Sequence, residues 1–546
     1  MSLALRGVPR PVATERGTAP AFGLWVAATA VGALVLLPVV YLAIRASEAD
    51  AGSWDLVLRA RTVWLAVRTL GLAAAVTGAA VAIGVPTAWL TTRTDLPGRR
   101  VWSLLLALPL VIPSYVGAFA LLAALGPRGL LRGAVARATG WESLPDISGF
   151  PGAFIALTLF TYPYVYLLVG AAIRGLDPAL EDATRGLGMG RWRSFFRLTL
   201  PLLRPSIAAG GLLVALYTLH DFGAVSMMRF QAFTHAIYLQ YRGAFDRTPA
   251  AIFSLMLIAI AAVILVAERR ARGRARYSSV RSAGRPPEPL ALGRWKWPAI
   301  SFCGIVVTLA FVLPIGVVLW WFVRGLAAGG EARLTWTAAG TSIGLSVMGA
   351  LLATVAALPL ALVAARRRDA VGAMADRVAW FGYALPGLVV ALAFVFFAAN
   401  FAPILYQSVP LVVIAYVVLF LPQSVEPIRS ALLQVGPRLE EVGRSLGRTR
   451  SEVFRAVVVP LIGRGALAGA ALVFLTAMKE LPATLLLRPT GVETLATRVW
   501  TGATAGLYSK AAGPALLLVI VCAVPLYFLA RRLEVTRVPE LEMHPE

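Results

Sequence analysis

The sequence predicts an all-α polytopic membrane protein with about 12 transmembrane helices in two parallel six-helix repeats. Three observations predict this class. Of 546 residues, 59% are hydrophobic and only 14% are charged, whereas soluble proteins average about 25% charged residues. Apolar stretches long enough to cross a bilayer recur along the chain, and two distant segments repeat each other at a constant spacing. This composition excludes an ordinary soluble enzyme.

Twelve apolar windows have the length, ~20 residues, that a membrane-crossing helix needs. The first set covers 22–45, 66–91, 101–125, 152–173, 206–227 and 249–267. The second set covers 298–323, 341–365, 376–399, 409–428, 465–487 and 512–530. Three arginines precede the first window, as in a signal peptide, but its apolar stretch is longer than a signal peptide requires. We therefore interpret it as a retained helix.

Basic residues determine the expected orientation. The chain has 51 Lys and Arg against 27 Asp and Glu, a net charge of +24, and the excess lies in short loops on one side of the predicted spans. This pattern indicates a multi-pass membrane protein with both termini in the cytoplasm, and it argues against nucleic acid as the partner. A basic linker at 268–297, rich in arginine and containing proline, separates a first half, 1–267, from a second half, 298–546.

The two halves contain an internal repeat. The segment 178–188 aligns with 437–447, and Pro201 aligns with Pro460, both at an offset of 259. Three upstream residues match at an offset of 273: Gly71 with Gly344, Pro86 with Pro359, and Pro113 with Pro386. Because each half has six spans, the two halves share one orientation, whereas consecutive inverted repeats normally need an odd number of spans.

The repeated segment is the longest charged loop of each half, between its fourth and fifth spans. We expect two short helices in each loop, at 178–200 and 437–459, joined by a glycine break, with the second helix ending at Pro201 or Pro460. An amphipathic linker on the membrane surface would explain one such loop. Two copies, in a chain with no other soluble domain, favour a docking surface for a partner.

The residues of this loop resemble a known signature. Asp182-Ala183, Gly188 and Pro201 follow the spacing found in the membrane subunit of binding-protein-dependent ABC importers, and Glu441, Gly447 and Pro460 repeat it. That signature runs Glu-Ala-Ala, three residues, Gly, nine residues, Ile-x-Leu-Pro. This chain departs from it at Asp182, which replaces Glu, and at Thr184, which replaces the second Ala. In the second copy Val442-Gly443 replace both Ala. The resemblance implies a type I ABC importer permease fold, in which each loop docks on a cytoplasmic ATPase. The implied docking residues are Glu181, Asp182, Ala183, Gly188, Pro201, Glu440, Glu441, Gly447 and Pro460.

Within that family, the chain resembles the fused ferric-iron permeases. The runs that carry this resemblance are Asp221–Ser226, Thr234–Tyr238, Lys479–Thr484 and Thr494–Trp500. Fused thiamine permeases are built in the same way and are the main alternative, while phosphonate and polyamine permeases rank lower. The resemblance implies a location in the bacterial inner membrane and an extracytoplasmic substrate-binding protein as a partner, besides the lipid bilayer.

The chain has no recognisable nucleotide site. A Walker A loop needs a glycine directly before its lysine, but Lys296, Lys479 and Lys510 follow Trp295, Met478 and Ser509. We therefore expect a transport subunit that is not itself an enzyme and binds no cofactor. ATP and Mg²⁺ would be bound by separate ATPase subunits, and two docking loops predict two copies.

Two ionisable dipeptides fall inside predicted spans, where charge is costly. His220-Asp221 lies in the fifth span and Lys479-Glu480 at the equivalent place in the eleventh. They either line the central route and set its gate, or pair with each other or with backbone to lock the packing. Their buried acids would also suit an ion-coupled secondary transporter. The histidines and cysteines are scattered, so we expect neither a metal site nor a membrane enzyme.

Overall fold

A computed structural model describes residues 22–535 except for short gaps. The gaps are 51, 53, 56–58, 128, 133–136, 139, 141–145, 178, 180–183, 185, 189, 244–246, 273–288, 330–335 and 368. Ten of the described helices are long and apolar enough to cross a membrane, and two bent helix pairs bring the number of possible spans to 12. The predicted all-α polytopic class is therefore confirmed.

The helices of the first half follow the predicted order. They are α1 (Phe22–Ser47), α3 (Ala60–Arg93), α4 (Arg99–Leu105), η1 (Leu108–Val111), α5 (Ser114–Leu125), α7 (Phe150–Arg174), α9 (Arg191–Ser194), η2 (Phe195–Thr199), α10 (Leu200–His220), α11 (Gly223–Met227), α12 (Phe233–Gly243) and α13 (Thr248–Arg272). The basic linker leads from α13 to the second half.

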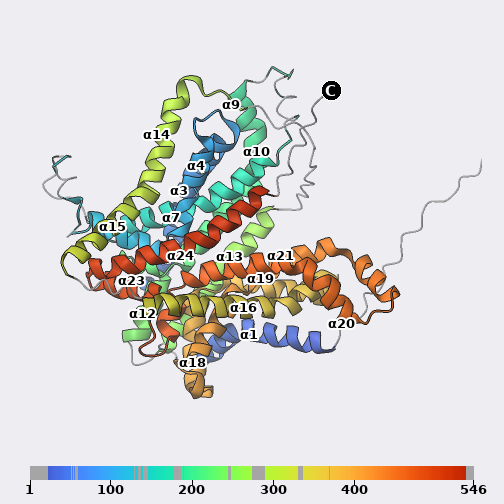
Figure 1. Ribbon diagram of the computed structural model, residues 1–546. Helices are drawn as coiled ribbons and strands as arrows, with labels where there is room; N and C mark the ends of the chain where they lie inside the picture. The colour runs from blue at the N-terminus through green and yellow to red at the C-terminus, as the bar shows by residue number, and fades with distance from the viewer. Residues whose placement is uncertain are drawn as a thin grey trace, which may run out of the picture.

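The second half repeats this order. Its helices are η3 (Gly293–Trp295), α14 (Lys296–Val307), η4 (Thr308–Val312), α15 (Leu313–Ala327), α16 (Trp336–Arg366), α17 (Ala370–Phe381), η5 (Gly382–Ala384), α18 (Gly387–Phe401), η6 (Pro403–Leu405), α19 (Val409–Ser445), α20 (Arg450–Val453), η7 (Phe454–Val458), α21 (Val459–Met478), α22 (Pro482–Leu487), α23 (Leu495–Thr504) and α24 (Tyr508–Val535). In Figure 1 the equivalent helices α9 and α20 lie at the top and at the right of the molecule, respectively.

The third span of each half, expected within the apolar windows 101–125 and 376–399, is sharply bent and divided into shorter helices. The chain bends by 95° between η1 and α5, and by 100° between η5 and α18. Pro113 and Pro386 stand at the two bends in extended conformation, each as the N-cap of the following helix. A proline lacks the N–H that would continue the helix and disfavours helical conformation in the residue before it.

The fifth span of each half ends earlier than predicted. The windows 206–227 and 465–487 were expected to be continuous, but α10 ends at His220 and α21 at Met478. The chain then turns and enters the short helices α11 and α22. The polar dipeptides therefore stand at helix ends, where a turn and not a continuous helix surrounds them.

The first helix of each half packs on the opposite half. Helix α1 contacts α16, α17 and α18, whereas α14 contacts α3 and α15 contacts α5. At one such contact Tyr41 on α1 donates a hydrogen bond to the carbonyl oxygen of Phe396 at 3.3 Å, and Asn400 Nδ2 donates to the Tyr41 hydroxyl at 3.2 Å. Figure 1 shows α1 lying along α16. The two halves are interlocked.

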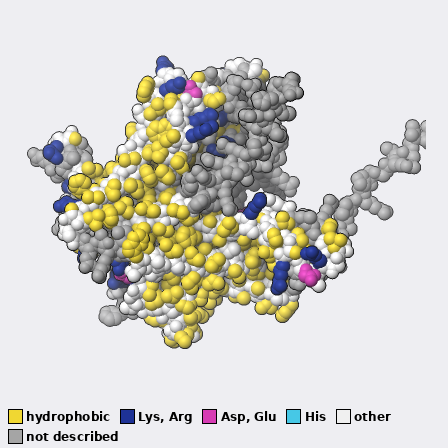
Figure 2. All heavy atoms as spheres, viewed as in Figure 1, with side chains coloured by type: hydrophobic (Ala, Val, Ile, Leu, Met, Phe, Trp, Pro, Cys, Tyr) yellow, Lys and Arg dark blue, Asp and Glu magenta, His cyan; other side chains and the backbone are white. Residues whose placement is uncertain are grey.

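The outer surface is largely apolar. Figure 2 shows hydrophobic side chains covering most of the visible face, with Lys and Arg gathered at its margins. Many large exposed side chains, such as Val101, Leu351 and Val355, belong to predicted spans. An exposed apolar area of this extent suits a surface in contact with lipid.

Candidate translocation site and docking segments

The two candidate docking segments, 178–200 and 437–459, share a turn at the same glycine. Gly188 and Gly447 have φ of +74° and +81°, a left-handed conformation that only glycine adopts without a steric penalty. Glu181, Asp182 and Ala183 lie outside the described residues. The backbone at Glu440 and Glu441 is helical and belongs to α19, which runs without a break from Val409 to Ser445; their side chains lie outside the description.

An exposed leucine precedes the turn glycine in both halves. Leu187 is 79% exposed and Leu446 is 76% exposed, and the two residues correspond at the offset of 259. The sequence analysis did not assign them a role. The usable signal was that the same apolar residue precedes the turn glycine in both charged loops. The two turns therefore expose an equivalent apolar side chain in each half.

The helices do not end at the loop prolines, contrary to the prediction. Pro201 and Pro460 lie in the first turns of α10 and α21. Each follows a π-helical turn, η2 or η7, that ends two residues earlier, and η4 precedes Pro314 in the same way. The wider π turn rearranges the backbone hydrogen bonds just before the proline, which has no N–H to donate. The chain thereby continues as a helix from the docking segment into the fifth span.

The Asp221 carboxylate binds groups of its own half. Oδ1 accepts hydrogen bonds from the backbone N–H groups of Ala224 at 2.8 Å and Val225 at 3.2 Å. Oδ2 accepts one from the Ser114 hydroxyl at the start of α5. Asp221 therefore satisfies the free N–H groups at the beginning of α11 and ties the end of α10 to the broken third span.

Glu480 makes the equivalent contact in the second half. Its Oε1 accepts a hydrogen bond from the N–H of Ala483 at 3.0 Å, and Ala483 corresponds to Ala224. Gly387 takes the place of Ser114, at the offset of 273. A Cβ atom on Gly387 would lie only 2.5 Å from Glu480 Oε1. The longer carboxylate thus faces a glycine, and the shorter carboxylate faces a serine.

The neighbouring residues, His220 and Lys479, behave differently. Lys479 Nζ donates a hydrogen bond to the carbonyl oxygen of Leu110 at 3.1 Å and so reaches from the second half to the first. His220 Nε2 is buried, and no described residue hydrogen-bonds to it. Of the four residues predicted at the pathway, only Lys479 makes a polar side-chain contact across the halves among the described residues.

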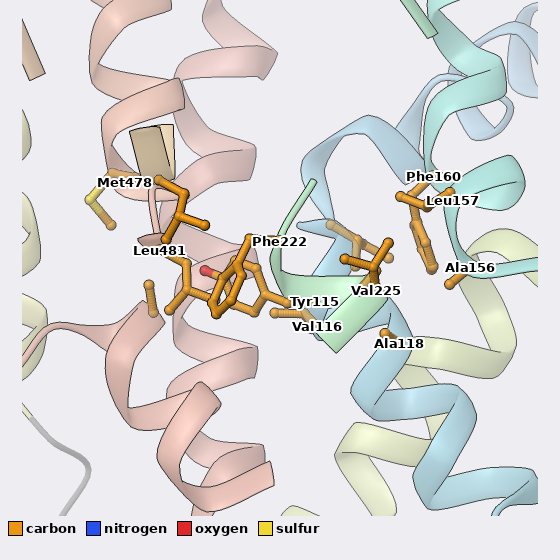
Figure 3. Packing of buried hydrophobic residues seen from close by; sticks show 14 of the residues in the cluster. Tyr115, Val116, Ala118, Ala156, Leu157, Phe160, Phe222, Val225, Met478 and Leu481 are labelled. Carbon is orange, nitrogen blue, oxygen red and sulfur yellow. The ribbon is translucent and has the colours of Figure 1, made fainter. Parts of the chain in front are cut away.

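Apolar side chains fill the junction beside these polar residues. Phe222 and Leu481, which correspond at the offset of 259, are each 1% exposed. The Phe222 ring centre lies 5.0 Å from that of Trp500 in the second half and 4.8 Å from that of Tyr238. Figure 3 shows Phe222, Leu481 and Tyr115 gathered at this junction. We call Phe222, Leu481, Trp500 and Tyr238 the central seam.

The described residues contain no cluster that would hold a metal ion tightly. No three His, Cys, Asp or Glu side chains come together in this part of the chain. The Asp221 and Glu480 carboxylates are already engaged with backbone N–H groups. The arrangement is suited to positioning the central seam, because each carboxylate holds the turn that presents Phe222 or Leu481.

A helical bundle of two interlocked repeats with an apolar outer surface (Figure 2) defines an integral membrane protein. The sequence profile of the binding-protein-dependent transport system inner membrane component family matches residues 80–276 and again 357–535. The chain belongs to this family and is a multi-pass protein of the inner membrane.

Individual relatives cover different parts of the chain. The Fe(3+)-transport system permease protein of Haemophilus influenzae is 33% identical over 94% of this chain and 98% of its own length. The thiamine transport system permease protein of Brucella suis is 27% identical over 77% of this chain and 78% of its own. The molybdenum transport system permease protein of Escherichia coli is 37% identical, but over only 26% of this chain and 60% of its own.

Proposed function

We propose that this chain is the permease of an ATP-driven importer of ferric iron. The observation that carries this proposal is the 33% identity to the Haemophilus Fe(3+) permease over nearly the full length of both chains. A ferric transport system permease protein of Actinobacillus pleuropneumoniae, 23% identical over 82% of this chain, adds support. Thiamine is the second candidate, because the Brucella thiamine permease also matches both halves.

Two copies of a cytoplasmic ATPase drive the cycle in this proposal. Each copy docks on one loop, 178–200 or 437–459, and binds ATP and Mg²⁺ there, outside the permease. The exposed pair Leu187 and Leu446 supports two equivalent contacts, and the basic loops support a cytoplasmic location for both loops and both termini. An extracytoplasmic binding protein delivers the solute to the opposite face.

The central seam is the gate in this proposal. The helix that starts in each docking segment continues through a π turn into α10 or α21 and ends at the carboxylate-held turn beside the seam. Movement of a docking segment is thereby transmitted to Phe222 or Leu481. Asp221 and Glu480 position the gate, and neither is a tight ligand of the cargo, since a transport site must also release it.

Uptake assays with matched solutes test the substrate. The chain is reconstituted in proteoliposomes with its ATPase and its binding protein, and uptake of radiolabelled ferric citrate is compared with that of thiamine. The proposal expects ATP-dependent iron uptake and no thiamine uptake. Thiamine uptake without iron uptake would replace ferric iron by the second candidate, and uptake of either solute that follows an ion gradient without ATP would overturn the importer assignment.

A further inference from the structure

A cavity lies where the first docking segment meets the first span of the second half. It has a volume of about 680 Å³ and opens between α3, η2, the end of the linker and α14. Its walls are mainly apolar and aromatic, including Trp89, Phe195 and Phe302, and the Trp89 and Phe195 rings meet edge-on at 5.6 Å. This volume lies within the range of ligand-binding cavities.

The equivalent place in the second half is filled by the protein itself. Leu362 and Phe454 correspond to Trp89 and Phe195, and both pack into a closed hydrophobic cluster. Leu24 and Val31 of α1 belong to that cluster, as does α17 through Val371 and Val378. The second half therefore packs its own apolar side chains at the place that corresponds to the cavity of the first half.

A short strap at the end of the linker, residues 289–296, forms the rim of the cavity. Leu290 pairs with the backbone of α3 and its following loop, through Leu290 N to Arg93 O at 2.8 Å and Asp95 N to Leu290 O at 3.0 Å. The Asp95 carboxylate accepts a hydrogen bond from Leu292 N at 2.8 Å and forms an ion pair with Lys296 at 3.2 Å. These contacts hold the rim in place.

The rim is basic and carries interfacial aromatic residues. Arg294 lines the cavity, and no carboxylate of the described chain pairs with it. Arg99 and Arg100 line a second cavity beside the neighbouring strap residue Pro289. Trp295 is 55% exposed and Trp297 is 76% exposed. Tryptophans at this exposure near a helix start are typical of the head-group level of a bilayer.

We propose that this cavity binds an anionic phospholipid. One acyl chain occupies the apolar space between Trp89, Phe195 and Phe302, and the phosphate lies at the rim near Arg294, with Arg99 and Arg100 adding positive charge. Basic pockets between membrane helices recognise anionic head groups in this way. Because the walls come from both the docking segment and α14, the bound lipid joins the coupling element of one half to the first span of the other. The site does not depend on which solute is carried.

Native mass spectrometry of the full-length chain, purified in detergent with added phosphatidylglycerol or phosphatidylcholine, tests the site. We expect one phosphatidylglycerol to remain bound at activation energies that remove phosphatidylcholine. Ala299→Phe, which places a ring into the cavity, is expected to remove the retained lipid. Arg294→Gln is expected to lower the bound fraction about fivefold, the effect of losing one arginine near an anionic head group.

Matched controls separate this site from general lipid contact. Ile305→Phe adds a ring at a 60% exposed position of the same helix, and Arg324→Gln removes a charge near the other end of the same span. Both are expected to retain the lipid. Equal retention in the wild type and in Ala299→Phe, with thermal unfolding unchanged, would overturn the proposal, as would equal retention of the two lipids by the wild type.

Discussion

Lys479 of the second half donates a hydrogen bond from its ammonium group to the carbonyl oxygen of Leu110 in the first half, at 3.1 Å. Leu110 belongs to η1, immediately before the 95° bend of the third span. The pseudo-equivalent residue, His220, has no such bond from Nε2 to the described part of the chain. Lys479 therefore joins the second half to the first through a polar contact beside the central seam.

Removal of that contact is expected to loosen the gate. Lys479→Met keeps most of the side-chain length but loses the donor, and a hydrogen bond from a charged group contributes about 1.5–3 kcal/mol. We expect basal ATPase activity of the reconstituted complex, without binding protein, to rise about tenfold, and solute uptake per ATP to fall. Lys510→Met, at an exposed position, is the control. Unchanged basal activity in Lys479→Met would show that the contact does not hold the gate.

The pairs Ser114–Asp221 and Gly387–Glu480 predict a compensating exchange. Gly387→Ser places new atoms against Glu480 Oε1, where a Cβ would already lie 2.5 Å away, and overpacking of this kind costs about 1–3 kcal/mol. We expect a lower thermal unfolding temperature and reduced uptake. The double variant Gly387→Ser with Glu480→Asp reproduces the pairing of the first half and is expected to recover most of both losses.

Two further variants complete that test. Glu480→Asp alone leaves the short carboxylate facing a glycine and should not raise the unfolding temperature of the wild-type chain. Recovery in the double variant must then depend on the pair. Gly463→Ala is a control, because no atom lies within 4 Å of the added Cβ. If Gly387→Ser were as stable and active as the wild type, the equivalence of the two sites would be wrong.

The left-handed glycines predict a local effect on docking. Gly188→Ala and Gly447→Ala force a residue with a Cβ into positive φ, at a cost of about 1–2 kcal/mol, and so change the turn that presents Leu187 or Leu446. We expect weaker binding of the ATPase, measured by co-purification, with unchanged amounts of folded permease. Gly186→Ala, at a helical position with open space around it, should bind normally. Normal binding by both turn variants would contradict a role for the turns.

Asp95 predicts a pH effect on the strap. The hydrogen bond from Leu292 N and the ion pair with Lys296 hold the pKa of the Asp95 carboxyl below its ordinary value of 3.8. The stabilisation is therefore fully present above that value and is lost as pH falls through the lowered pKa. We expect Asp95→Asn to accelerate amide exchange at Leu290 and Leu292 at neutral pH and to abolish the acid-dependent change, after correction for intrinsic exchange rates. Equal protection of these amides in the wild type and in Asp95→Asn would show that Asp95 does not stabilise the strap.

The sequence predicted the elements that depend on composition and spacing. Apolar length located the spans, and the repeat aligned Gly188 with Gly447, which share a positive φ. Pro109 and Pro113 are typical of a helix kink, and a bend lies at Pro113 and at its repeat counterpart Pro386. The size of the bends was not predicted, because hydropathy averages over a window and does not register where a helix breaks. For the same reason the windows ran past His220 and Met478, the true ends of α10 and α21.

The sequence pattern could not predict contacts between residues that are distant along the chain. The pairs Ser114–Asp221 and Gly387–Glu480 form because the bend of the third span contacts the end of the fifth span. No local sequence signal predicts that contact. The packing of α1 on α16 was also unpredictable, since an apolar helix fits any apolar neighbour in a membrane. The contacts agree with the packing hypothesis for the polar dipeptides, because Asp221 and Glu480 bind backbone groups and Lys479 joins the halves. The hypothesis that these residues line the route stays a prediction.

Cross-linking from the two exposed leucines tests the central claim most directly. Leu187→Cys and Leu446→Cys are made separately in a background lacking the buried Cys303 and Cys522, and the complex with its ATPase is treated with a short thiol-to-amine cross-linker. The account predicts a permease–ATPase product from each variant, and a product with two ATPase subunits when both cysteines are present. No product from either position, or a product from one position only, would contradict paired docking loops.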